Sequence, residues 1–479
     1  MKLEQLIKEL DVEKIIGETD IEISDVKTDS NNVGCGDLFV ALEGVNTDGH
    51  DYAHQAQTYG GVAVVCQREL NTSLTQIIVK NARKALSKIA AAFYQRKCDR
   101  LKLIGVVGTN GKTTTSRMIY EILNDCGINC GVIGTLGTFY NQKYISTDLT
   151  TPDPLTLHKI LSLMYDDGVK VVVMEVSAHA IFWDKVYGLN FEIGVFTNFS
   201  RDHIDFFSDM ENYKNSKLRF FKENSCKFVV TNSDDPVGKD IESLNGKVVS
   251  YGLENPADVF AVNVEELSKT TEFVINLFDC IYQIKTNFLG RFNVSNALAA
   301  ATTCALIGAQ PEKIAKALKK IKGVAGRLER VYADKFSVIL DYAHTPDGLE
   351  KTILALRPTC KGRLVTVFGC GGNRDKGKRA QMGEISAKLS DFTIVTTDNP
   401  RFEEPMEIIR DIEKGVLKHS KRYLLIEDRR SAIEYAINWA KQGDVVLIAG
   451  KGSENYQEIL GVKHAYNDKD TVNELIRGK

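Results

Sequence analysis

The segment Gly108-Thr109-Asn110-Gly111-Lys112-Thr113-Thr114 decides the fold of this chain. It follows a short apolar run, Leu103 to Val107, and opens a stretch of helical period, Lys112 to Asn124. Glycines let the backbone curl so that its N–H groups face phosphate oxygens, and the positive end of the following helix strengthens such a site. Lys112 can reach the β- and γ-phosphates, and a threonine hydroxyl can bind Mg²⁺. The segment therefore predicts a nucleotide phosphate loop between a strand and a helix.

The loop departs from the usual spacing, because Val106 stands where a glycine is common. The alternative is a glycine-rich turn that only caps a helix, but the strand before and the helix after favour nucleotide binding. Such a loop does not distinguish an ATPase, a GTPase, a kinase and a ligase. No Asn-Lys-x-Asp segment that would read guanine is present, which disfavours a GTP switch.

Apolar runs on both sides of the loop predict the rest of the fold. Runs that are apolar throughout and separated by helices are typical of parallel strands buried on both faces. Those after the loop are Val169 to Met174, Ile193 to Thr197, Phe336 to Leu340, Arg363 to Phe368, Phe392 to Thr396, Tyr423 to Ile426 and Val445 to Ala449. Asp258 to Lys285 alternates instead, as in a small antiparallel patch. Before the loop, short apolar runs and a helical stretch, Ala82 to Gln95, form a separate block.

These patterns predict an α/β protein of three domains. At about 100–200 residues per domain, a chain of 479 residues suits that number. The boundaries are residues 1–100 for an N-terminal α/β domain, 101–329 for a central domain with a mostly parallel P-loop-type sheet, and 330–479 for a C-terminal Rossmann-like, doubly wound domain.

Composition excludes several classes of protein. A formal net charge of −2 gives no basic field for nucleic acid. Ten scattered cysteines without a CxxC pair predict free thiols in a reducing cytosol rather than a zinc or thioredoxin-type site. The first residues are charged and amphipathic, unlike a signal peptide, and no apolar stretch is long enough to span a membrane. We therefore expect a cytoplasmic protein.

Further segments carry a resemblance to a known family. They include Asp29-Ser30, Gly36 to Ala41, GTNGKTT at 108–114, Thr150-Thr151-Pro152, Met174 to Ser177, Thr197 to His203, Gly290 to Asn296, Asp341 to Pro346, Gly369 to Lys378 and Asp398 to Arg401. Each is a modest signal, but their order and spacing together are specific. Along nearly its whole length the chain resembles the Mur ligases, most of all the members that add diaminopimelate.

The resemblance implies an ATP-dependent, amide-bond-forming ligase of peptidoglycan precursor synthesis, and so of cell-wall biogenesis, cell shape and cell division. Its substrates would be ATP, UDP-N-acetylmuramoyl-L-alanyl-D-glutamate and meso-diaminopimelate, joined through an acyl phosphate. The first domain would hold the uridine end, the central domain ATP and the third domain the amino acid. The resemblance also implies two Mg²⁺ ions, CO₂ bound as a lysine carbamate, and a monomer without a nucleic-acid partner.

The implied catalytic residues are Lys112, Glu175, His203 and Lys217. Glu175 ends an apolar run, where a carboxylate beside a phosphate loop can bind Mg²⁺; the alternative is a surface glutamate. His203 alone would more often be a structural histidine, and Lys217 a solvated helix residue. The resemblance makes His203 a metal ligand with Thr113 and Glu175, and makes Lys217 a carbamate (N6-carboxylysine) that binds the second Mg²⁺.

The resemblance also assigns the three substrate sites. For ATP they are Gly108, Thr109, Asn110, Gly111, Lys112, Thr113, Thr114, Asn198, Asn296, Arg327 and Asp341; for the sugar peptide Ser30, Thr150, Thr151, Ser177 and Lys185; for the amino acid Arg374, Asp398, Asn399, Pro400, Arg401, Gly450 and Glu454. The alternative for Thr150 and Thr151 is helix N-capping, which Asp153 can equally supply. The chain departs from the family pattern at Asn31, Ala178, Lys185 and Ser453, where Arg, Ser, Arg and His are usual.

Charge gives an independent reason to expect diaminopimelate. It differs from lysine by one carboxylate, so a selective pocket needs a cation aimed at that end. Arg401 follows the run Phe392 to Thr396, at the strand edge where α/β sites lie, and its planar fork binds a carboxylate bidentately. Arg374 would grip the other carboxylate, and Glu454 the ammonium. The alternative is that Arg401 is a surface residue paired with Glu403 or Glu404.

Two rival functions remain open. One is a related ligase, acting on folate polyglutamate, adding L-lysine or using another Mur substrate; Ser30 and the segment Gly36 to Ala41 argue against folate. The other is a nucleotide-driven switch that performs no ligation. An assay of phosphate release separates ligation from a nucleotide switch, because only a ligase requires both the sugar peptide and the amino acid.

Overall fold

The structure is a computed structural model that describes residues 1–44, 47–244, 247–267 and 269–477. The chain divides into two compact units. The first comprises residues 1–107, 128–194 and 216–228, and the second comprises residues 108–127, 195–215 and 229–479. The division passes through the central block, and each unit is described by itself.

The first unit opens with a five-stranded sheet in the order β1-β5-β4-β3-β2. Its strands are β1 (Val12–Ile16), β2 (Val26–Lys27), β3 (Leu38–Val40), β4 (Ala63–Cys66) and β5 (Thr75–Val79). Only β1 runs antiparallel to its neighbour. Its helices are α1 (Leu3–Ile7), α2 (Ala53–Thr58) and α3 (Ala82–Phe93), with 3₁₀ turns η1 (Ser30–Asn32), η2 (Gly49–Tyr52) and η3 (Lys97–Arg100). The predicted N-terminal α/β block is confirmed.

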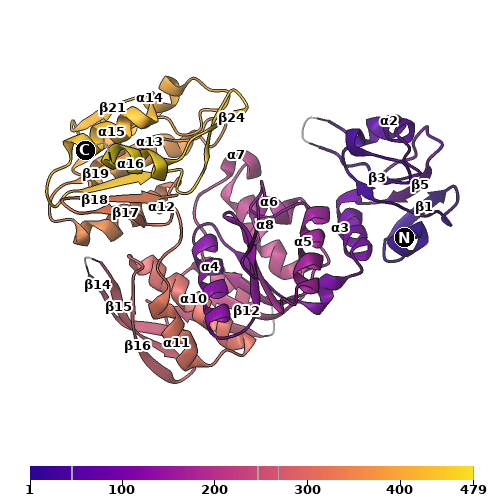
Figure 1. Cartoon of the computed structure of the whole chain (residues 1–479), viewed down its shortest axis with the longest axis horizontal. Helices are drawn as coiled ribbons and strands as arrows, with labels where there is room; N and C mark the ends of the chain where they lie inside the picture. Colours follow the sequence, from indigo (N-terminus) through magenta and orange to yellow (C-terminus); the bar gives the residue numbers. More distant parts are fainter. Residues whose placement is uncertain (45–46, 245–246, 268, 478–479) are drawn as a thin grey trace. The chain divides into compact units, whose positions relative to one another are not determined.

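The rest of the first unit is a mostly parallel sheet in the order β11-β6-β10-β7-β8-β9. Its strands are β6 (Lys102–Val107), β7 (Cys130–Gly134), β8 (Gly137–Tyr140), β9 (Lys143–Ile145), β10 (Val171–Glu175) and β11 (Phe191–Phe196), whose last two residues fall in the second unit. β6, β10 and β7 are parallel and almost wholly buried, as their apolar runs predict, and β8 and β9 form an antiparallel edge. Helices α5 (Pro154–Asp166) and α6 (Ala178–Phe182) belong here, and α3 packs against α5 (Figure 1).

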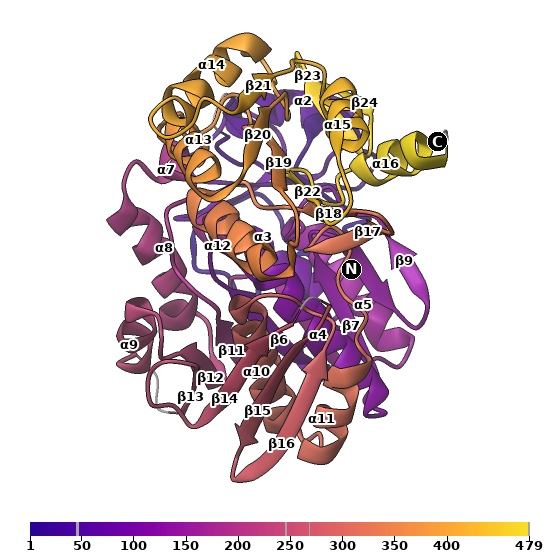
Figure 2. The ribbon, with the colours of Figure 1, turned by 90° about the vertical axis from the view of Figure 1, so that its left-hand side faces the viewer.

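The second unit begins with the loop and α4 (Lys112–Asp125). Strands β12 (Cys226–Asn232), β13 (Val248–Gly252) and β14 (Val259–Glu266) pair in parallel, and β14, β15 (Thr271–Leu277) and β16 (Cys280–Thr286) form the predicted antiparallel patch. The helices are α7 (Ile204–Phe207), α8 (Met210–Glu223), α9 (Pro236–Glu242), α10 (Arg291–Ile307) and α11 (Pro311–Lys320), and α8 crosses into the first unit. α10 packs on β13–β15 and α11 on β16 (Figure 2).

The last part of the second unit is a six-stranded sheet in the order β17-β18-β22-β19-β20-β21. Its strands are β17 (Glu329–Ala333), β18 (Ser337–Asp341), β19 (Leu364–Phe368), β20 (Phe392–Val395), β21 (Tyr423–Leu425) and β22 (Val445–Ala449), and only β17 is antiparallel. Hydrophobic cores fill both faces, one under α12 (Pro346–Leu356), α13 (Gly377–Leu389) and α14 (Pro405–Val416), the other under α15 (Arg429–Trp439) and α16 (Asp468–Arg477). The predicted doubly wound sheet is confirmed, and a short hairpin, β23 (Tyr456–Ile459) and β24 (Val462–Ala465), is added to it.

Candidate active site

The phosphate loop is packed so closely that only glycine fits at two positions. A Cβ atom on Gly108 would lie 1.9 Å from Thr197 Oγ1, and one on Gly111 would lie 2.4 Å from Asn296 Oδ1. Gly111 also has a φ of +84°, which disfavours any other residue. The loop runs directly into α4, so its backbone N–H groups stand at a helix N-terminus. The predicted loop is therefore formed.

The side chain of Asn198 fixes the curl of the loop. Its Oδ1 accepts from the backbone N–H of Asn110 at 2.9 Å, and its Nδ2 donates to the carbonyl of Asn110 at 3.0 Å. Thr197 Oγ1 donates to that same carbonyl at 2.7 Å. Thr109 Oγ1 accepts from the N–H of Ser200 at 3.1 Å. Asn198 thus lies at the loop, as predicted, and it shapes the backbone that would face phosphates.

Lys112 and Thr113 occupy the mouth of the loop. Lys112 Nζ donates to the carbonyls of Gly108 at 2.9 Å and Thr109 at 2.7 Å, so the ammonium lies over the loop. Arg327 Nη2 donates to Thr113 Oγ1 at 3.0 Å, and its guanidinium lies 4.3 Å from the centre of the Tyr342 ring. The predicted ATP residues Lys112, Thr113 and Arg327 are therefore gathered at one place.

Asp341 holds the turn that presents Arg327. Its Oδ2 accepts from the N–H of Leu328 at 2.7 Å, and its Oδ1 accepts from the N–H of Ala343 at 2.9 Å and from Thr352 Oγ1 at 3.1 Å. Burial raises the pKa of this carboxyl despite those hydrogen bonds. The carboxylate is 8% exposed at the end of β18, so it supports the turn rather than opening to solvent.

Asn296 lies beneath the loop on α10. It is 6% exposed; its Nδ2 donates to Asn293 Oδ1 at 3.0 Å and its Oδ1 accepts from Thr115 Oγ1 at 3.3 Å. The bond with Thr115 joins α10 to α4. Its predicted contact with the adenine ring stays a prediction.

A second cluster surrounds His203. His203 has a φ of +55°, uncommon for a residue with a side chain and often found at functional sites. Its Nε2 lies 3.3 Å from Asp202 Oδ2, and His344 Nε2 lies 3.6 Å from the same oxygen. Burial opposes the charged form of Asp202, but the hydrogen bond and charge of His344 outweigh it and hold the pKa of this carboxyl well below its usual value. Asp202 and His344 stand inside the quoted family segments, but no role was predicted for them.

In the first unit, Glu175 is the last residue of β10 and pairs with Val106, two residues before the loop. It is 2% exposed, so the alternative of a surface glutamate is wrong. Its Oε1 accepts from the N–H of Thr135 at 2.9 Å and its Oε2 accepts from Thr135 Oγ1 at 3.1 Å. A Cβ on Gly134 would lie 2.1 Å from Oε1. The carboxylate is therefore buried and oriented.

Lys217 lies on α8, as its spacing predicts. It is 1% exposed, so the alternative of a solvated lysine is wrong. Reactive lysines in proteins are commonly buried ones. Burial therefore suits a modified lysine, which is what the resemblance implies.

The residues predicted for the sugar peptide form a polar cluster in the first unit. Thr151 Oγ1 donates to the carbonyl of Glu175 at 2.9 Å and accepts from the N–H of Ser177 at 3.1 Å. Lys185 Nζ donates to the carbonyl of Thr151 at 3.4 Å, and Thr150 Oγ1 lies 3.1 Å from the hydroxyl of Thr135.

Residues other than Thr150 and Thr151 cap the neighbouring helices. Asp153 caps α5, so the capping alternative for the two threonines is wrong. Ser177 caps α6. Ser30 lies apart from the cluster, in η1, where its hydroxyl donates to Gln55.

The residues predicted for the amino acid converge at the carboxyl ends of β20 and β22. Arg401 has a φ of +52°; its Nε donates to Glu458 Oε2 at 3.1 Å and its Nη1 to the carbonyl of Gly372 at 2.8 Å. Its partner is thus Glu458, not Glu403 or Glu404 as the alternative supposed. Two fixed contacts orient the guanidinium while its side chain stays 19% exposed.

Lys451 organises the floor of this pocket. It is 0% exposed, and its ammonium donates to Asn399 Oδ1 at 2.8 Å, to Glu454 Oε2 at 3.1 Å and to the carbonyl of Tyr456 at 2.8 Å. Asn399 Nδ2 donates to Glu454 Oε2 at 3.0 Å. Lys451 stands in sequence between Gly450 and Glu454, which were predicted for the amino acid, but its own role was not predicted.

Asp398 carries the most informative atom of the pocket. Its Oδ2 is buried and has no hydrogen-bond partner among the residues that the structure describes. The nearest cation, Arg429 Nη1, lies 4.0 Å away and is on a guanidinium already paired with Asp468. Buried carboxylate oxygens are normally satisfied, so this one is suited to an ammonium from a ligand. A Cβ on Gly450 would lie 2.6 Å from it.

Arg374 and Pro400 complete the predicted set. Arg374 is half-exposed, with Nη1 3.8 Å from Asp205 Oδ2, so its contact with a substrate carboxylate stays a prediction. The carbonyl of Pro400 would lie 1.9 Å from a Cβ on Gly372, which shows how tightly the loop at 399–401 packs on the loop at 371–375.

The predicted metal ligands fall in different units, Thr113 and His203 in the second and Glu175 and Lys217 in the first. Within the described part of the chain, no three His, Cys, Asp or Glu side chains gather as a metal site. The oxygen donors of the set, the Thr113 hydroxyl, the oriented Glu175 carboxylate and the implied Lys217 carbamate, fit Mg²⁺, whereas the imidazole of His203 is a less usual ligand for that ion. No described helix is long and apolar enough to cross a membrane.

Comparison with known proteins identifies the family. The Mur ligase middle domain matches residues 106–304, the Mur ligase glutamate ligase domain residues 326–452, and the Mur ligase family catalytic domain residues 22–94. A relative from Clostridium acetobutylicum, named UDP-N-acetylmuramoyl-L-alanyl-D-glutamate–2,6-diaminopimelate ligase 1, is 42% identical over 484 residues, covering 100% of this chain and 99% of its own.

Solved structures of Mur ligases are similar to this chain as well. One titled as a UDP-N-acetylmuramoyl-L-alanyl-D-glutamate–2,6-diaminopimelate ligase is 31% identical with a TM-score of 0.71, covering 100% of this chain and 99% of that one. A MurF ligase from Thermotoga maritima in complex with ADP, 20% identical with a TM-score of 0.66, covers 95% of this chain and 97% of its own and shows the same fold. The chain belongs to the Mur ligase family.

Proposed function

We propose that this protein is the ATP-dependent ligase that adds meso-diaminopimelate to UDP-N-acetylmuramoyl-L-alanyl-D-glutamate in peptidoglycan precursor synthesis. The names of full-length relatives support this substrate pair. One observation of the site carries it: Arg401, oriented by Glu458 and the carbonyl of Gly372, stands in the same loop as Asp398, whose Oδ2 accepts no hydrogen bond from the described residues. A cation and a carboxylate in one loop suit a zwitterionic end, with one carboxylate and one ammonium.

The reaction proceeds in two steps. A carboxylate oxygen of the D-glutamate residue attacks the γ-phosphorus of ATP, and the bond to ADP breaks, giving an acyl phosphate. The free amine of diaminopimelate then attacks the acyl carbon, and the tetrahedral intermediate loses phosphate to leave the amide. The protons that the amine sheds pass to solvent or to phosphate. Both steps depend on positioning and on compensation of phosphate charge.

Residues of the phosphate loop supply that compensation. The loop N–H groups and Lys112 hold the β- and γ-phosphates, and Arg327 lies beside Thr113, where it can meet the same oxygens. Asn198 and Asp341 position these groups through the loop and the turn. Exclusion of water would protect the acyl phosphate from hydrolysis.

Two Mg²⁺ ions would neutralise the charge that moves between the phosphates when bound. Thr113, Glu175 and His203 are the proposed ligands of this chain, with Lys217 as a carbamate formed with CO₂. The burial of Glu175 and Lys217 supports the assignment. Extra density on the Lys217 amine is expected in a crystal structure of active enzyme with Mg²⁺ and nucleotide. A plain ammonium there, with activity demonstrated, would contradict the carbamate.

The sugar peptide would contact Ser30, Thr150, Thr151, Ser177 and Lys185, and the amino acid would contact Arg374, the loop 398–401, Gly450 and Glu454. Domains at 1–100, 101–329 and 330–479 are supported by the three matched ranges. We also propose a cytoplasmic monomer; the ten cysteines are free, as is usual in a reducing cytosol, which supports the compartment.

Omission of single substrates tests ligation against the rival nucleotide switch. Phosphate release is measured with ATP, Mg²⁺, the sugar peptide and diaminopimelate, and then with each omitted. A ligase releases phosphate steadily only with the full set. Steady release from ATP alone, independent of both other substrates, would support the switch instead.

A further inference from the structure

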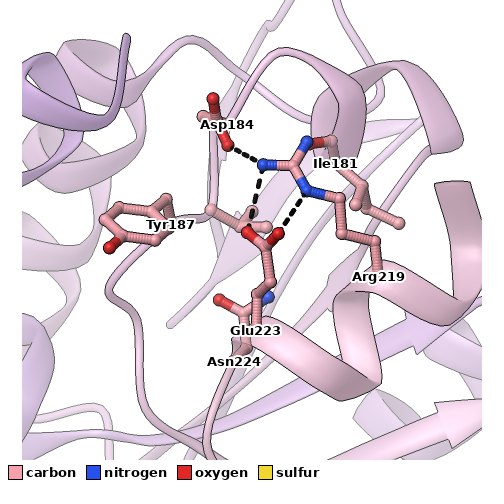
Figure 3. Close-up of a pocket in the computed structure, with 7 residues that line it drawn as sticks. Ile181, Asp184, Tyr187, Arg219, Glu223 and Asn224 are labelled. Carbon is pink, nitrogen blue, oxygen red and sulfur yellow. Dashed lines mark hydrogen bonds and ion pairs between the residues drawn. The ribbon is translucent and has the colours of Figure 1, made fainter. Parts of the chain in front are cut away.

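A network of charged residues in the first unit surrounds Asp184, beside the predicted sugar-peptide residue Lys185. Figure 3 shows Arg219 placed between the carboxylates of Asp184 and Glu223. The pocket beside them has a volume of about 10 Å³, roughly the space of one water molecule. No substrate fits there, so the network acts on its neighbours rather than on a ligand of its own.

Asp184 occupies a backbone position that normally belongs to glycine. Helix α6 ends at Phe182, and Asp184 has a φ of +54°. Its N–H donates to the carbonyl of Ile181 at 3.1 Å, and the N–H of Lys185 donates to the carbonyl of Ala180 at 2.9 Å. This is the Schellman ending of a helix, in which the left-handed residue is usually Gly or Asn. An aspartate there adds a carboxylate at a cost in backbone strain, which points to a use for that carboxylate.

The carboxylate is buried and bound from two sides. Asp184 is 7% exposed. One oxygen accepts from Arg219 Nη2, and the other accepts from Asn81 Nδ2 at 3.3 Å. The backbone carbonyl of Asp184 accepts from Ser87 Oγ at 2.7 Å. Helices α3 and α8 therefore both hold this one residue.

Arg219 reinforces the same segment. Besides Asp184, its guanidinium donates to the carbonyls of Ile181 at 3.1 Å and Phe182 at 3.4 Å, the last two residues of α6. It also donates to both oxygens of Glu223, at 2.7 and 3.0 Å. Glu223 pairs with Arg219 and, at 3.3 Å, with Lys84 of α3, but no hydrogen bond joins it to the end of α6 among the described residues, so it offers a matched comparison.

The contacts of Asp184 and Arg219 fix the position of the next residue, Lys185. Its backbone is fixed by the helix ending, and its Nζ reaches the carbonyl of Thr151 at 3.4 Å, within the proposed sugar-peptide cluster. We propose that Asp184 is a positioning residue for the sugar peptide: held by Arg219 and α3, it presents Lys185 to that substrate. The inference rests on the proposed function, which makes Lys185 a substrate contact.

Four variants of the full-length enzyme test it: Asp184→Asn, Asp184→Gly, Glu223→Gln and Lys185→Ala. Both changes at Asp184 tolerate the left-handed backbone, and glycine removes its strain. Both variants lose the charge-assisted bond to Arg219, so KM for the sugar peptide is expected to rise about tenfold in each. KM for ATP and for diaminopimelate is expected to stay within about twofold of the native value. Glu223→Gln is expected to leave all three KM values within about twofold.

The double variant Lys185→Ala/Asp184→Asn separates positioning from general damage. If Asp184 acts through Lys185, adding Asp184→Asn to Lys185→Ala raises KM no further, because the two effects are coupled. Unchanged KM in Asp184→Asn and Asp184→Gly, or full additivity in the double variant, would overturn the inference. Equal rises for all three substrates, or an equal rise in Glu223→Gln, would also overturn it. An unchanged KM in Lys185→Ala would instead contradict the sugar-peptide assignment, and the inference with it.

Discussion

At the scale of single residues, the phosphate loop and the amino-acid pocket share one device: a cation held in place by bonds to its own chain. Lys112 is held by two loop carbonyls, and Arg401 by Glu458 and the carbonyl of Gly372. Such contacts fix the direction of a charge before substrate arrives, which lowers the cost of ordering it on binding.

Replacement of Lys112 by alanine is expected to reduce turnover by at least about 10³-fold, because the loop loses its charge compensation for the moving phosphoryl group. The fold should persist, since the side chain lies over the loop, where it donates to the carbonyls of Gly108 and Thr109, and does not fill a hydrophobic core. Phosphate release and thermal unfolding check the two parts. The variant Lys222→Ala, which changes an exposed lysine, is the control. Near-normal release by Lys112→Ala would show that the loop does not act on phosphates.

Replacement of Arg401 by alanine is expected to lower the ratio of kcat/KM for meso-diaminopimelate over L-lysine by about 100-fold or more, because the distal carboxylate loses its partner. Arg401→Gly removes the same side chain and suits the φ of +52° better. Arg410→Ala, exposed on α14, is the control. An unchanged ratio in both Arg401 variants would remove Arg401 from substrate selection.

Residue roles could be predicted from sequence only where a family motif carried them. Glu175 ends its strand and Asn198 contacts the phosphate loop, whereas the role of Arg401 in binding the amino acid stays a prediction. The residues that bond to the predicted site residues were not predicted. They are Thr135 for Glu175, Glu458 for Arg401 and Lys451 for Glu454. They are distant in sequence or ordinary in type, and only folding brings them close.

At the scale of elements, strands with unbroken apolar runs were predicted well, whereas β7 was not. Its sequence, Cys130–Gly134, holds two glycines, which have low strand propensity. The structure gives the reason for both. A Cβ on Gly131 would lie 2.9 Å from Met164 Cε, and one on Gly134 would meet Glu175. Close packing therefore requires glycine at these two positions, and the glycines kept β7 from being predicted from the sequence.

Helix α5 carries a pH dependence of stability. His158 is 2% exposed, and burial lowers its pKa to about 4 from 6.5. The folded state therefore binds the proton less readily than the unfolded state, so the contribution is complete above pH 6.5 and is lost as pH falls towards 4. The free energy of unfolding should drop by about 3 kcal/mol over that range.

Denaturant unfolding between pH 7 and 4 checks this, with His158→Gln as the test variant. That variant should show a flatter profile, while the exposed His54→Gln should keep the native slope. Equal slopes for the native protein and His158→Gln would exclude His158 as the source.

At the scale of the whole molecule, the sequence blocks and the compact units differ. The pattern predicts three domains, and Mur ligase family models match residues 22–94, 106–304 and 326–452, whereas the chain divides into two units whose border passes through the central block. Apolar periodicity reports which strands are buried but not how densely neighbouring blocks contact each other, so the units could not be predicted. The fold class itself could, because βα alternation after the loop allows few other arrangements.

The central claim, addition of diaminopimelate to the sugar dipeptide, is tested most directly by a competition reaction. Enzyme, ATP, Mg²⁺ and UDP-N-acetylmuramoyl-L-alanyl-D-glutamate are incubated with equal concentrations of meso-diaminopimelate and L-lysine, and the product is identified by mass spectrometry. The account predicts one dominant product whose mass is that of the sugar dipeptide joined to diaminopimelate by loss of one water. A dominant lysine product, or no ligated product beside ATP hydrolysis, would contradict it.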